Sequence, residues 1–493
     1  MTTPSWRRTS SAGGTEPLED LFATHDALAV AELVRRGEIG ARELLDASLA
    51  RLRRVNGRLN AITDFYEGDL LERSVAAAGE GPFHGIPFVV KQLMADCAGT
   101  PTTVGSRFFA REPVAVRDSA AVARMRRAGL VIVGRSNTSE FGLAPTTEPA
   151  FGGATLNPWR ADLSPGGSSG GSAAVVAARA LPMAHATDGG GSIRIPASLC
   201  GLFGLKPSRG RISLAPIGET LAGAGAQLCV SLSVRDSAAL LDALAGGEPG
   251  DPYRAPEAEG TFLDATRRAP ARLRVAFLRK PVGWEAMDPA LIAAVERTAK
   301  RLEALGHHVE EAVPDYDAEA TGKAFGTVMC ANTFTNIQVR ANGRVPGADD
   351  LEPVTRLYAE QGARIGAHDY IRAVQTFHRA GRQLGSFFET FDILLSPTIA
   401  RPSLPLGAVR MDGTLETYEE GLAPMVAFTA VCNATGVPAM SVPLEWTEDG
   451  LPIGMHFVAR YGAEATLLSL AAQLEGAHPW RDRRPSGEKR HDR

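Results

Sequence analysis

Apolar positions along the chain follow helical spacing in some stretches and short continuous runs in others. Residues 26–55 carry two amphipathic patterns interrupted near Gly37 and Gly40, which predicts two helices. The apolar run IPFVV ends on Lys91, and LVIVG covers residues 130–134; both have the length of buried strands. This alternation of helix and strand predicts an α/β fold.

The same alternation continues to the end of the chain. Helices are predicted over 118–128 with Asp118 as the cap, over 233–244 and over 288–305, and mainly helical structure over 318–391. Strands are predicted over 273–278, 391–398 and 433–444, and the last two are expected to rejoin the same sheet. Proline, glycine and charge concentrate in 246–260, which predicts a linker.

The most informative stretch is 164–196, SPGGSSGGSAAVVAARALPMAHATDGGGSIRIP. It holds two glycine-rich loops, around Ser168 and Ser192, joined by a small-residue segment of about helical length. Glycine lets a ligand approach the main chain, so each loop can direct N–H groups at developing negative charge. Two serines on such loops indicate acyl transfer with one serine as nucleophile. Glycine and serine are also the ordinary composition of linkers, but the apolar run 173–184 indicates packed structure.

Composition limits the classes of partner. The 493 residues allow two or three domains or one large one. Lys and Arg number 52 against 56 Asp and Glu, a formal net charge of -4, so the overall field favours neither nucleic acid nor an anionic membrane. The five cysteines are scattered and form no CxxC pair, which predicts reduced thiols in a cytoplasmic protein.

Neither end of the chain has the pattern of a targeting segment. Residues 1–20 contain an arginine pair with no apolar run after it, and 476–493 are polar and basic, so both are predicted to be tails. The longest apolar run, 173–186, is interrupted by Arg179 and His185 and is too short to span a bilayer.

Several chemistries compete for the two serines. Residues 166–170 match the GxSxG nucleophile elbow around Ser168, but NPWRADLSP before them is not the strand that this motif requires. A Ser-His-Asp hydrolase also needs a histidine, and only His185 lies in the central stretch. A phosphate loop would continue into GK[ST], and neither loop does.

A serine nucleophile with a lysine base remains. Lys91 closes an apolar strand, so it is either a surface charge or a desolvated catalytic amine. As a base it needs its pKa lowered from about 10.4 by about three units, a shift that burial can supply.

Several motifs resemble those of the amidase signature family of serine hydrolases. GIPFVVK, GGSSGGSAA and DGGGSIRIPAS occur in the family's order, and GRSNTSEFG, GLKPSRGRIS, FDILLSPT, NATGVPAMSVP and GLPIGMHFVA resemble its other segments. The resemblance covers 27–244 and 391–475. It implies one large α/β domain over 21–475, with a mixed central β-sheet covered by helices on both faces and 246–260 as a surface excursion.

The resemblance also implies roles for individual residues. Ser192 would be the nucleophile, Lys91 the base, and Ser168, after a cis peptide bond from Gly167, the relay between them. The oxyanion hole would be formed by the N–H groups of Gly189, Gly190, Gly191 and Ser192, and support would come from Ser169, Asp188 and Arg194. A catalytically silent binding protein is disfavoured because all three catalytic positions are occupied.

Two positions depart from the family pattern. Gln92 stands where many members have Asp, and Gly189 stands where many have Thr. Neither change removes a proton-transfer group. We expect differences in the hydrogen bonding around Lys91 and in the shape beside the oxyanion hole.

The resemblance implies hydrolysis of a carboxylic amide, linear or cyclic, with anilides and carbamates included. TTEP, GATLNPW and AHATDGGGSIRIPAS look closer to the branch with 6-aminohexanoate cyclic dimer hydrolase and broad-specificity amidases than to glutamyl-tRNA amidotransferase A subunits. The alternatives are such a subunit, which would release ammonia from glutamine to a partner, and the Ser-His-Asp hydrolase with Ser168 as nucleophile. The expected partners are a small amide and water, without cofactor, metal, nucleic acid or membrane, and a homodimer is left open.

Overall fold

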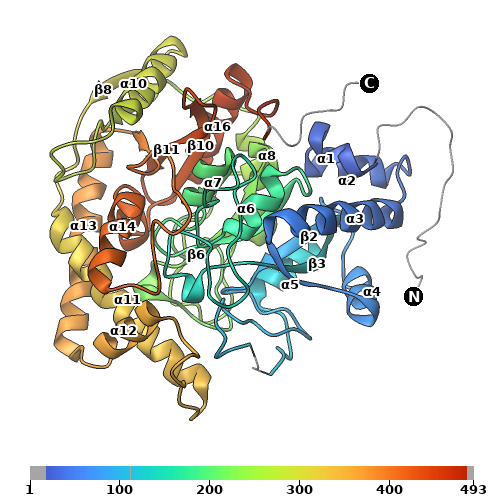
Figure 1. Cartoon of the computed structure of the whole chain (residues 1–493). Helices are drawn as coiled ribbons and strands as arrows, with labels where there is room; N and C mark the ends of the chain where they lie inside the picture. Colours follow the sequence, from blue (N-terminus) through green and yellow to red (C-terminus); the bar gives the residue numbers. More distant parts are fainter. Residues whose placement is uncertain (1–17, 111–112, 486–493) are drawn as a thin grey trace.

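The computed structural model describes residues 18–110 and 113–485, and its strands form two sheets (Figure 1). The smaller sheet has the order β1-β3-β2, in which β1 is antiparallel and β2 parallel to β3. Its strands are β1 (Ile62–Phe65), β2 (Ile86–Lys91) and β3 (Leu130–Ser136).

The larger sheet is mixed and has eight strands in the order β4-β6-β5-β10-β11-β9-β7-β8. Neighbours are antiparallel from β4 to β9, and β9, β7 and β8 are parallel. Its strands are β4 (Met183–Asp188), β5 (Phe203–Lys206), β6 (Ala226–Ser231), β7 (Arg274–Phe277), β8 (His308–Glu311), β9 (Ile393–Pro397), β10 (Ala439–Trp446) and β11 (Pro452–Ala459). The C-terminal strands therefore rejoin the sheet that β4 begins, as predicted.

Helices surround the two sheets. Figure 1 shows α1 to α4 on one side of the molecule and α11 to α13 on the opposite side. The α-helices are α1 (Leu21–Thr24), α2 (Ala27–Arg35), α3 (Ala41–Leu59), α4 (Gly68–Ala76), α5 (Ala120–Arg127), α6 (Gly170–Ala177), α7 (Arg194–Cys200), α8 (Val234–Leu244), α9 (Phe262–Ala265), α10 (Pro289–Ala304), α11 (Ala318–Ala341), α12 (Pro353–Gly362), α13 (Ala367–Thr390), α14 (Leu415–Val426), α15 (Ala430–Thr435) and α16 (Glu464–Ala477). The 3₁₀ helices are η1 (Leu18–Asp20), η2 (Glu140–Gly142) and η3 (Leu221–Gly223). This mixed α/β architecture confirms the predicted fold class.

The small residues of the central stretch pack α6 into the interior. Every residue of α6, GGSAAVVA, is buried, and the helix lies against β2, β4, α3 and α7. Small side chains allow such close approach on all sides of one helix. The N-terminal end of α6 is thereby fixed between the last residue of β2 and the last residues of β4.

Most predicted elements are confirmed. Asp26 caps α2 by accepting a hydrogen bond from the Ala29 N–H, and Ser233 caps α8 by accepting from the Asp236 N–H. The region 318–391 is mainly helical, with α11, α12 and α13 in succession. The strand that ends on Lys91 is β2.

Three predicted elements differ from the structure. Asp118 does not cap α5, because Ser119 holds the cap position and the Asp118 carboxylate accepts instead from the Ala98 N–H and Arg126. The small-residue segment is not one helix but α6 followed by β4. Within 433–444 only the part from 439 is a strand, because 433–435 complete α15.

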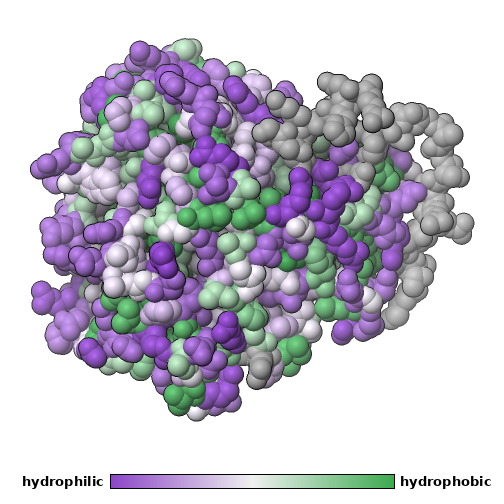
Figure 2. All heavy atoms as spheres, viewed as in Figure 1, coloured by the Kyte–Doolittle hydropathy of each residue, from purple (hydrophilic) through white to green (hydrophobic). Residues whose placement is uncertain are grey.

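The face of the molecule seen in Figure 1 is mostly polar. Figure 2 shows polar residues over most of it, with apolar residues in small groups among them. Within 18–110 and 113–485, no helix combines the length and apolar character needed to cross a membrane.

Of the predicted tails, 1–17 and 486–493 lie outside the described residues. Residues up to 485 pack on the body, since Trp480 is buried and its indole N–H donates to the Leu232 carbonyl.

Candidate active site

Both serines of the central stretch line one cavity of about 970 Å³. Ser168 lies at the start of α6, and Ser192 lies in the loop between β4 and α7. Ser192 is half-buried, whereas Ser168 is 1 % exposed. The structure therefore brings the two glycine-rich loops to a common space large enough for a small-molecule substrate.

Lys91, the last residue of β2, is fully buried. Its Nζ lies 2.8 Å from Ser168 Oγ, 2.8 Å from Ser169 Oγ and 2.9 Å from Thr187 Oγ1. All three partners are hydroxyl groups. In the described parts of the chain, no carboxylate forms an ion pair with this amine. Of the two interpretations of Lys91, the desolvated amine is therefore the one that fits.

The protonation of Lys91 follows from this environment. Burial lowers the pKa of Lys91 well below its ordinary value, although the nearby Asp188 charge acts in the opposite direction. A neutral amine donates two hydrogen bonds and accepts one. Ser169 donates its own hydroxyl proton to the Thr187 carbonyl at 3.1 Å, so its Oγ accepts from Lys91. The amine lone pair is then available to accept a proton from Ser168 or Thr187.

A buried amine alone does not make such a site. Lys206 is also fully buried, and desolvation lowers its pKa to about 7. Its Nζ, however, donates to the Pro207 carbonyl at 2.8 Å and does not line the cavity. Lys91 differs because it reaches the cavity through a serine.

Close backbone packing fixes the position of Ser168. The Gly167–Ser168 peptide bond is cis, as the family resemblance implies. A Cβ on Gly167 would lie 1.9 Å from the Thr146 carbonyl oxygen, so only glycine fits there. The Gly170 N–H donates to Thr147 Oγ1 at 3.0 Å, which ties the start of α6 to the preceding loop.

Asp188 shapes the loop that carries Ser192. Its carboxylate accepts from the Gly191 N–H at 2.7 Å and from the Ile193 N–H at 3.1 Å. The prediction of four oxyanion donors therefore needs one correction, because the Gly191 N–H donates to Asp188 and Gly191 does not line the cavity. Gly189, Gly190 and Ser192 line the cavity, and within the described residues their N–H groups have no protein acceptor.

Asp188 is itself held by Arg194. The Arg194 guanidinium contacts both carboxylate oxygens, at 2.9 Å and 3.0 Å, and both side chains are fully buried. Burial alone would raise the pKa of Asp188, but Arg194 and the surrounding donors hold it well below its ordinary value. Asp188 is thus an anion at neutral pH and can keep the loop in place.

Two further residues of this network were not singled out from the sequence. Asn433 donates to the Asp188 carboxylate and accepts from Arg194, and Thr429 donates its hydroxyl proton to the Gly190 carbonyl at 2.6 Å. Asn433 opens the segment NATGVPAMSVP, which matched a family segment but suggested no role. The match of this segment could have drawn attention to Asn433, but no feature of the sequence distinguished Thr429.

His185 does not contact either serine. Its Nδ1 accepts from the Lys91 backbone N–H at 3.3 Å, and its Nε2 bonds Gln227 Oε1 at 3.2 Å. Burial lowers the pKa of His185 to about 3. Both ring nitrogens are occupied away from the cavity, so the Ser-His-Asp interpretation loses its base.

The structure shows the contacts of Gln92 and Gly189, the two residues that depart from the family pattern. The Gln92 amide donates to Asp64 at 2.9 Å and accepts from the Thr103 N–H at 3.0 Å, and the fully buried Arg135 contacts the same oxygen at 3.4 Å. A second carboxylate at position 92 would face Asp64, which the neutral amide avoids. At Gly189, the space of a side chain is taken by Leu221.

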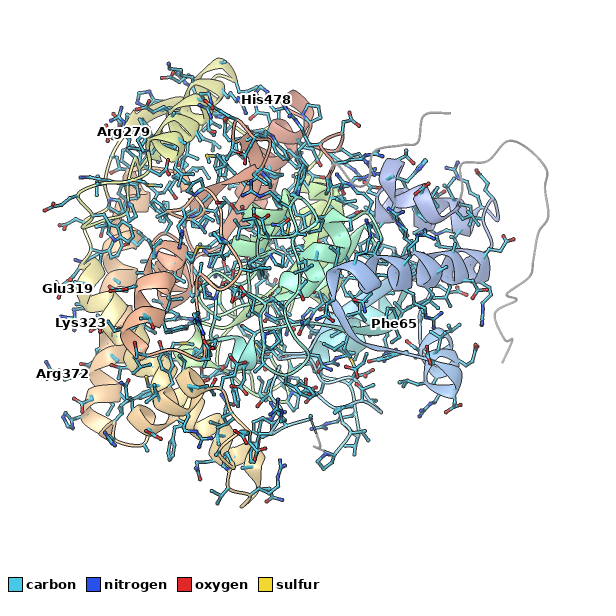
Figure 3. The ribbon with its side chains drawn as sticks, viewed as in Figure 1. Phe65, Arg279, Glu319, Lys323, Arg372 and His478 are labelled. Carbon is cyan, nitrogen blue, oxygen red and sulfur yellow. The ribbon has the colours of Figure 1, made fainter. Side chains whose placement is uncertain are left out.

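The walls of the cavity come from segments that carried no chemical signal in the sequence. One face of α11 supplies Phe325, Met329 and Asn336, and α12 and α14 supply further lining, including Tyr358. Figure 3 labels Lys323, another lining residue, beside Glu319 on α11, across the molecule from Phe65 of β1. The helices α11 and α12 of the 318–391 region thus supply a large part of the cavity wall.

The described residues contain no cluster of three His, Cys, Asp or Glu side chains able to hold a metal ion. The five cysteines, at positions 97, 200, 229, 330 and 432, are all buried and unpaired, as predicted.

Comparisons with known proteins agree with this geometry. The family model described as Amidase matches residues 43–468. The 6-aminohexanoate-cyclic-dimer hydrolase of Paenarthrobacter ureafaciens is 39 % identical over 477 residues, which are 93 % of this chain and 96 % of that protein.

Solved structures show the same fold. A structure of 6-aminohexanoate cyclic dimer hydrolase complexed with substrate superposes with a TM-score of 0.89 at 38 % identity, covering 95 % of this chain and 100 % of the other. A bacterial aryl acylamidase of the amidase signature family gives a TM-score of 0.83 at 26 % identity, covering 93 % and 97 %. The chain therefore belongs to the amidase signature family, and it is an amidase, a hydrolase that acts on carbon–nitrogen bonds.

Proposed function

We propose that this amidase hydrolyses a carboxylic amide through an acyl-enzyme on Ser192, with Lys91 as the base and Ser168 as the relay. The observation that carries the proposal is the buried Lys91 amine, which contacts three hydroxyls and reaches the cavity through Ser168. An amine kept neutral by burial can accept a proton at neutral pH, which a solvated lysine cannot.

Acylation would proceed by two linked proton transfers. Ser192 Oγ attacks the carbonyl carbon while its proton passes to Ser168, and the proton of Ser168 passes to Lys91 Nζ. The carbonyl oxygen becomes an oxyanion facing the N–H groups of Gly189, Gly190 and Ser192. When the carbon–nitrogen bond breaks, the proton returns from Lys91 through Ser168 to the leaving nitrogen.

Deacylation would use the same groups in the same order. Water replaces the amine, attacks the Ser192 ester and gives its proton to Lys91 through Ser168. The ester bond then breaks, the proton returns to Ser192 Oγ, and the carboxylic acid leaves. Ser169 would take no proton in this scheme but holds Lys91 Nζ by accepting a hydrogen bond from it, and Asp188 and Arg194 hold the Ser192 loop.

The cavity supports a neutral organic amide, linear or cyclic, with anilides and carbamates included. Its volume of about 970 Å³ exceeds the needs of a simple aliphatic amide, and its walls combine rings such as Phe325 with amide groups such as Asn336. The names of the relatives, a cyclic dimer hydrolase and an aryl acylamidase, agree with this range.

We further propose that residues 21–475 act as one domain in the cytoplasm. Side chains from Leu21 to Trp480 belong to one apolar cluster, and five buried unpaired cysteines suit a reducing compartment. The loop 246–260 lies at the edge of this body, where Arg124 binds the Gly246 carbonyl and Glu248.

Active-site labelling tests the assignment of the nucleophile. A fluorophosphonate should add once to the purified chain, and mass spectrometry of the digest should place the adduct on Ser192, with no adduct in Ser192→Ala. An adduct on Ser168 would support the elbow interpretation instead. Assays of the chain alone with glutamine, an aliphatic amide, an anilide and a cyclic amide should show turnover of the neutral amides, whereas glutamine alone as substrate would indicate an amidotransferase subunit.

A further inference from the structure

Gly189 and Leu221 share one space at the wall of the cavity. A Cβ on Gly189 would lie 2.8 Å from Leu221 Cδ1, and among the described residues Leu221 supplies the only atom within 4 Å of that position apart from the chain neighbours of Gly189. Gly189 is not in the left-handed backbone region, so its own conformation would accept a side chain. Leu221 therefore occupies the room that a residue such as Thr would need at this position.

The backbone holds Leu221 firmly in this place. Leu221 and Ala222 have φ values of 57° and 54°, a conformation that side chains other than glycine adopt rarely and only where neighbours fix it. The fixing contacts are close by: Arg209 donates to the Gly223 carbonyl at 2.6 Å, and Asn433 donates to the Ala224 carbonyl at 3.0 Å. The backbone segment that carries Leu221 is thus held in place by these hydrogen bonds.

Phe325 of α11 continues the same wall. Its ring would lie 3.5 Å from a Cβ on Gly190, which is ordinary contact, and it packs with Leu221 and Phe377 in one apolar cluster. Leu221 and Phe325 therefore lie against Gly189 and Gly190, the two glycines that line the cavity next to Ser192.

The direction of the substrate follows from the proton path. Ser168 must reach the leaving nitrogen, and the cavity next to Ser168 is bounded by Leu93 and Gly142. The amine part then lies on that side of the reacting carbon. The acyl part extends the other way, toward the wall that covers Gly189 and Gly190.

We propose that Leu221, packed with Phe325, is a specificity-determining residue that limits branching on the substrate carbon next to the scissile carbonyl. This proposal rests on the proposed function. Gly189 is the matched position that leaves room for Leu221. The predicted class of good substrates has an unbranched carbon at this position, whereas amides with one or two methyl branches are excluded by contact with the leucine.

A series of anilides tests the wall directly. The substrates are the propanoyl, 2-methylpropanoyl and 2,2-dimethylpropanoyl anilides, and the quantity is the ratio of kcat/KM for the branched to the unbranched acyl group. Leu221→Ala should raise this ratio by about tenfold or more, the size expected for making room for methyl groups. Leu422→Ala enlarges the same cavity from α14 and should leave the ratio unchanged. Equal ratios in the wild type and Leu221→Ala would overturn the proposal.

Thermal unfolding tests the Gly189–Leu221 pair without any substrate. Gly189→Thr should lower Tm because the new side chain meets Leu221, and the double variant Gly189→Thr/Leu221→Ala should regain most of the loss relative to Leu221→Ala alone. Leu422→Ala should give no such recovery. If Gly189→Thr lowered Tm equally in the wild type and in the Leu221→Ala variant, the shared space would be refuted. A wild-type chain that turns over no amide would count against the proposed function, while the Tm cycle would still decide the contact.

Discussion

Two basic side chains near the Ser192 loop, Lys91 and Arg194, are fully buried, and their partners differ. Lys91 contacts three hydroxyls, at 2.8 to 2.9 Å. Arg194 contacts the Asp188 carboxylate through two nitrogens and also binds the Thr429 carbonyl and Asn433. Burial is the same in the two places, but a guanidinium is intrinsically more basic than an amine, and Arg194 alone is bonded to a carboxylate.

This difference in partners gives Lys91 a role in proton transfer and Arg194 a role in holding the loop. Without a bonded carboxylate, the Lys91 amine loses its proton easily, which a base requires. With Asp188 as a bonded anion, Arg194 stays charged, and the pair fixes the loop N–H groups. The buried Lys91 amine can accept and return a proton, whereas the buried Arg194 cation can only hold the loop in position.

The largest expected effect is at Lys91. Lys91→Arg keeps a cation but cannot release its proton, and Lys91→Ala removes the base, so both should lower kcat/KM for an amide by at least about 10⁴-fold. In the wild type the neutral amine is the active form, so kcat/KM should fall as pH drops through the lowered pKa of Lys91. Initial rates over a pH series measure both effects.

Ser168 offers a control for this prediction. Ser168→Ala removes the relay but leaves the base, so a water molecule in its place can leave residual activity above that of Lys91→Ala. Circular dichroism should show the same fold in each variant. Near-full activity of Lys91→Arg would contradict the lysine mechanism.

The second largest effect is expected at Asp188, which holds the Ser192 loop and takes no part in the proposed chemistry. Asp188→Asn leaves the Arg194 guanidinium buried without its anion, which should lower the free energy of unfolding by about 3–5 kcal/mol. Among the described residues Lys91 has no such ion pair, so Lys91→Met should cost far less stability. Chemical denaturation of the two variants at pH 7 measures the contrast.

A matched surface pair provides the control for Asp188. Asp412 and Arg410 form an exposed ion pair, and Asp412→Asn should change stability by less than about 1 kcal/mol. Equal losses for Asp188→Asn and Asp412→Asn would mean that Asp188 does not anchor the loop.

The sequence singled out Ser168, Ser192 and Lys91 because the signals around them are local. Glycines around Ser168 and Ser192 mark backbone that can approach a ligand. The apolar run before Lys91 alone favoured a surface charge, whereas the structure buries the amine completely. Elements such as β2, β3 and α8 were predicted for the same reason, because the spacing of their apolar residues is local. Local spacing decided each of these predictions.

What the sequence missed depends on contacts between distant segments. Thr429 reaches Gly190 across 239 positions, and Leu221 meets Gly189 from a short 3₁₀ turn without a motif. Asp118 fits a cap by its local pattern, but a hydrogen bond to Arg126 uses its carboxylate instead. Tertiary contacts decided these positions, and a single sequence carries no local signal for them.

The smallest expected effect concerns His185. His185→Gln keeps one polar contact to the neighbouring main chain or Gln227 and loses the other, which should reduce kcat/KM by less than about tenfold. Because burial lowers the pKa of His185 to about 3, the ring is neutral across the working range and contributes no step above about pH 5. The acid limb of the pH profile should therefore stay where it is in the wild type. A lost acid limb in His185→Gln, together with retained activity in Lys91→Arg, would move the base from the lysine to the histidine and overturn the comparison between Lys91 and Arg194.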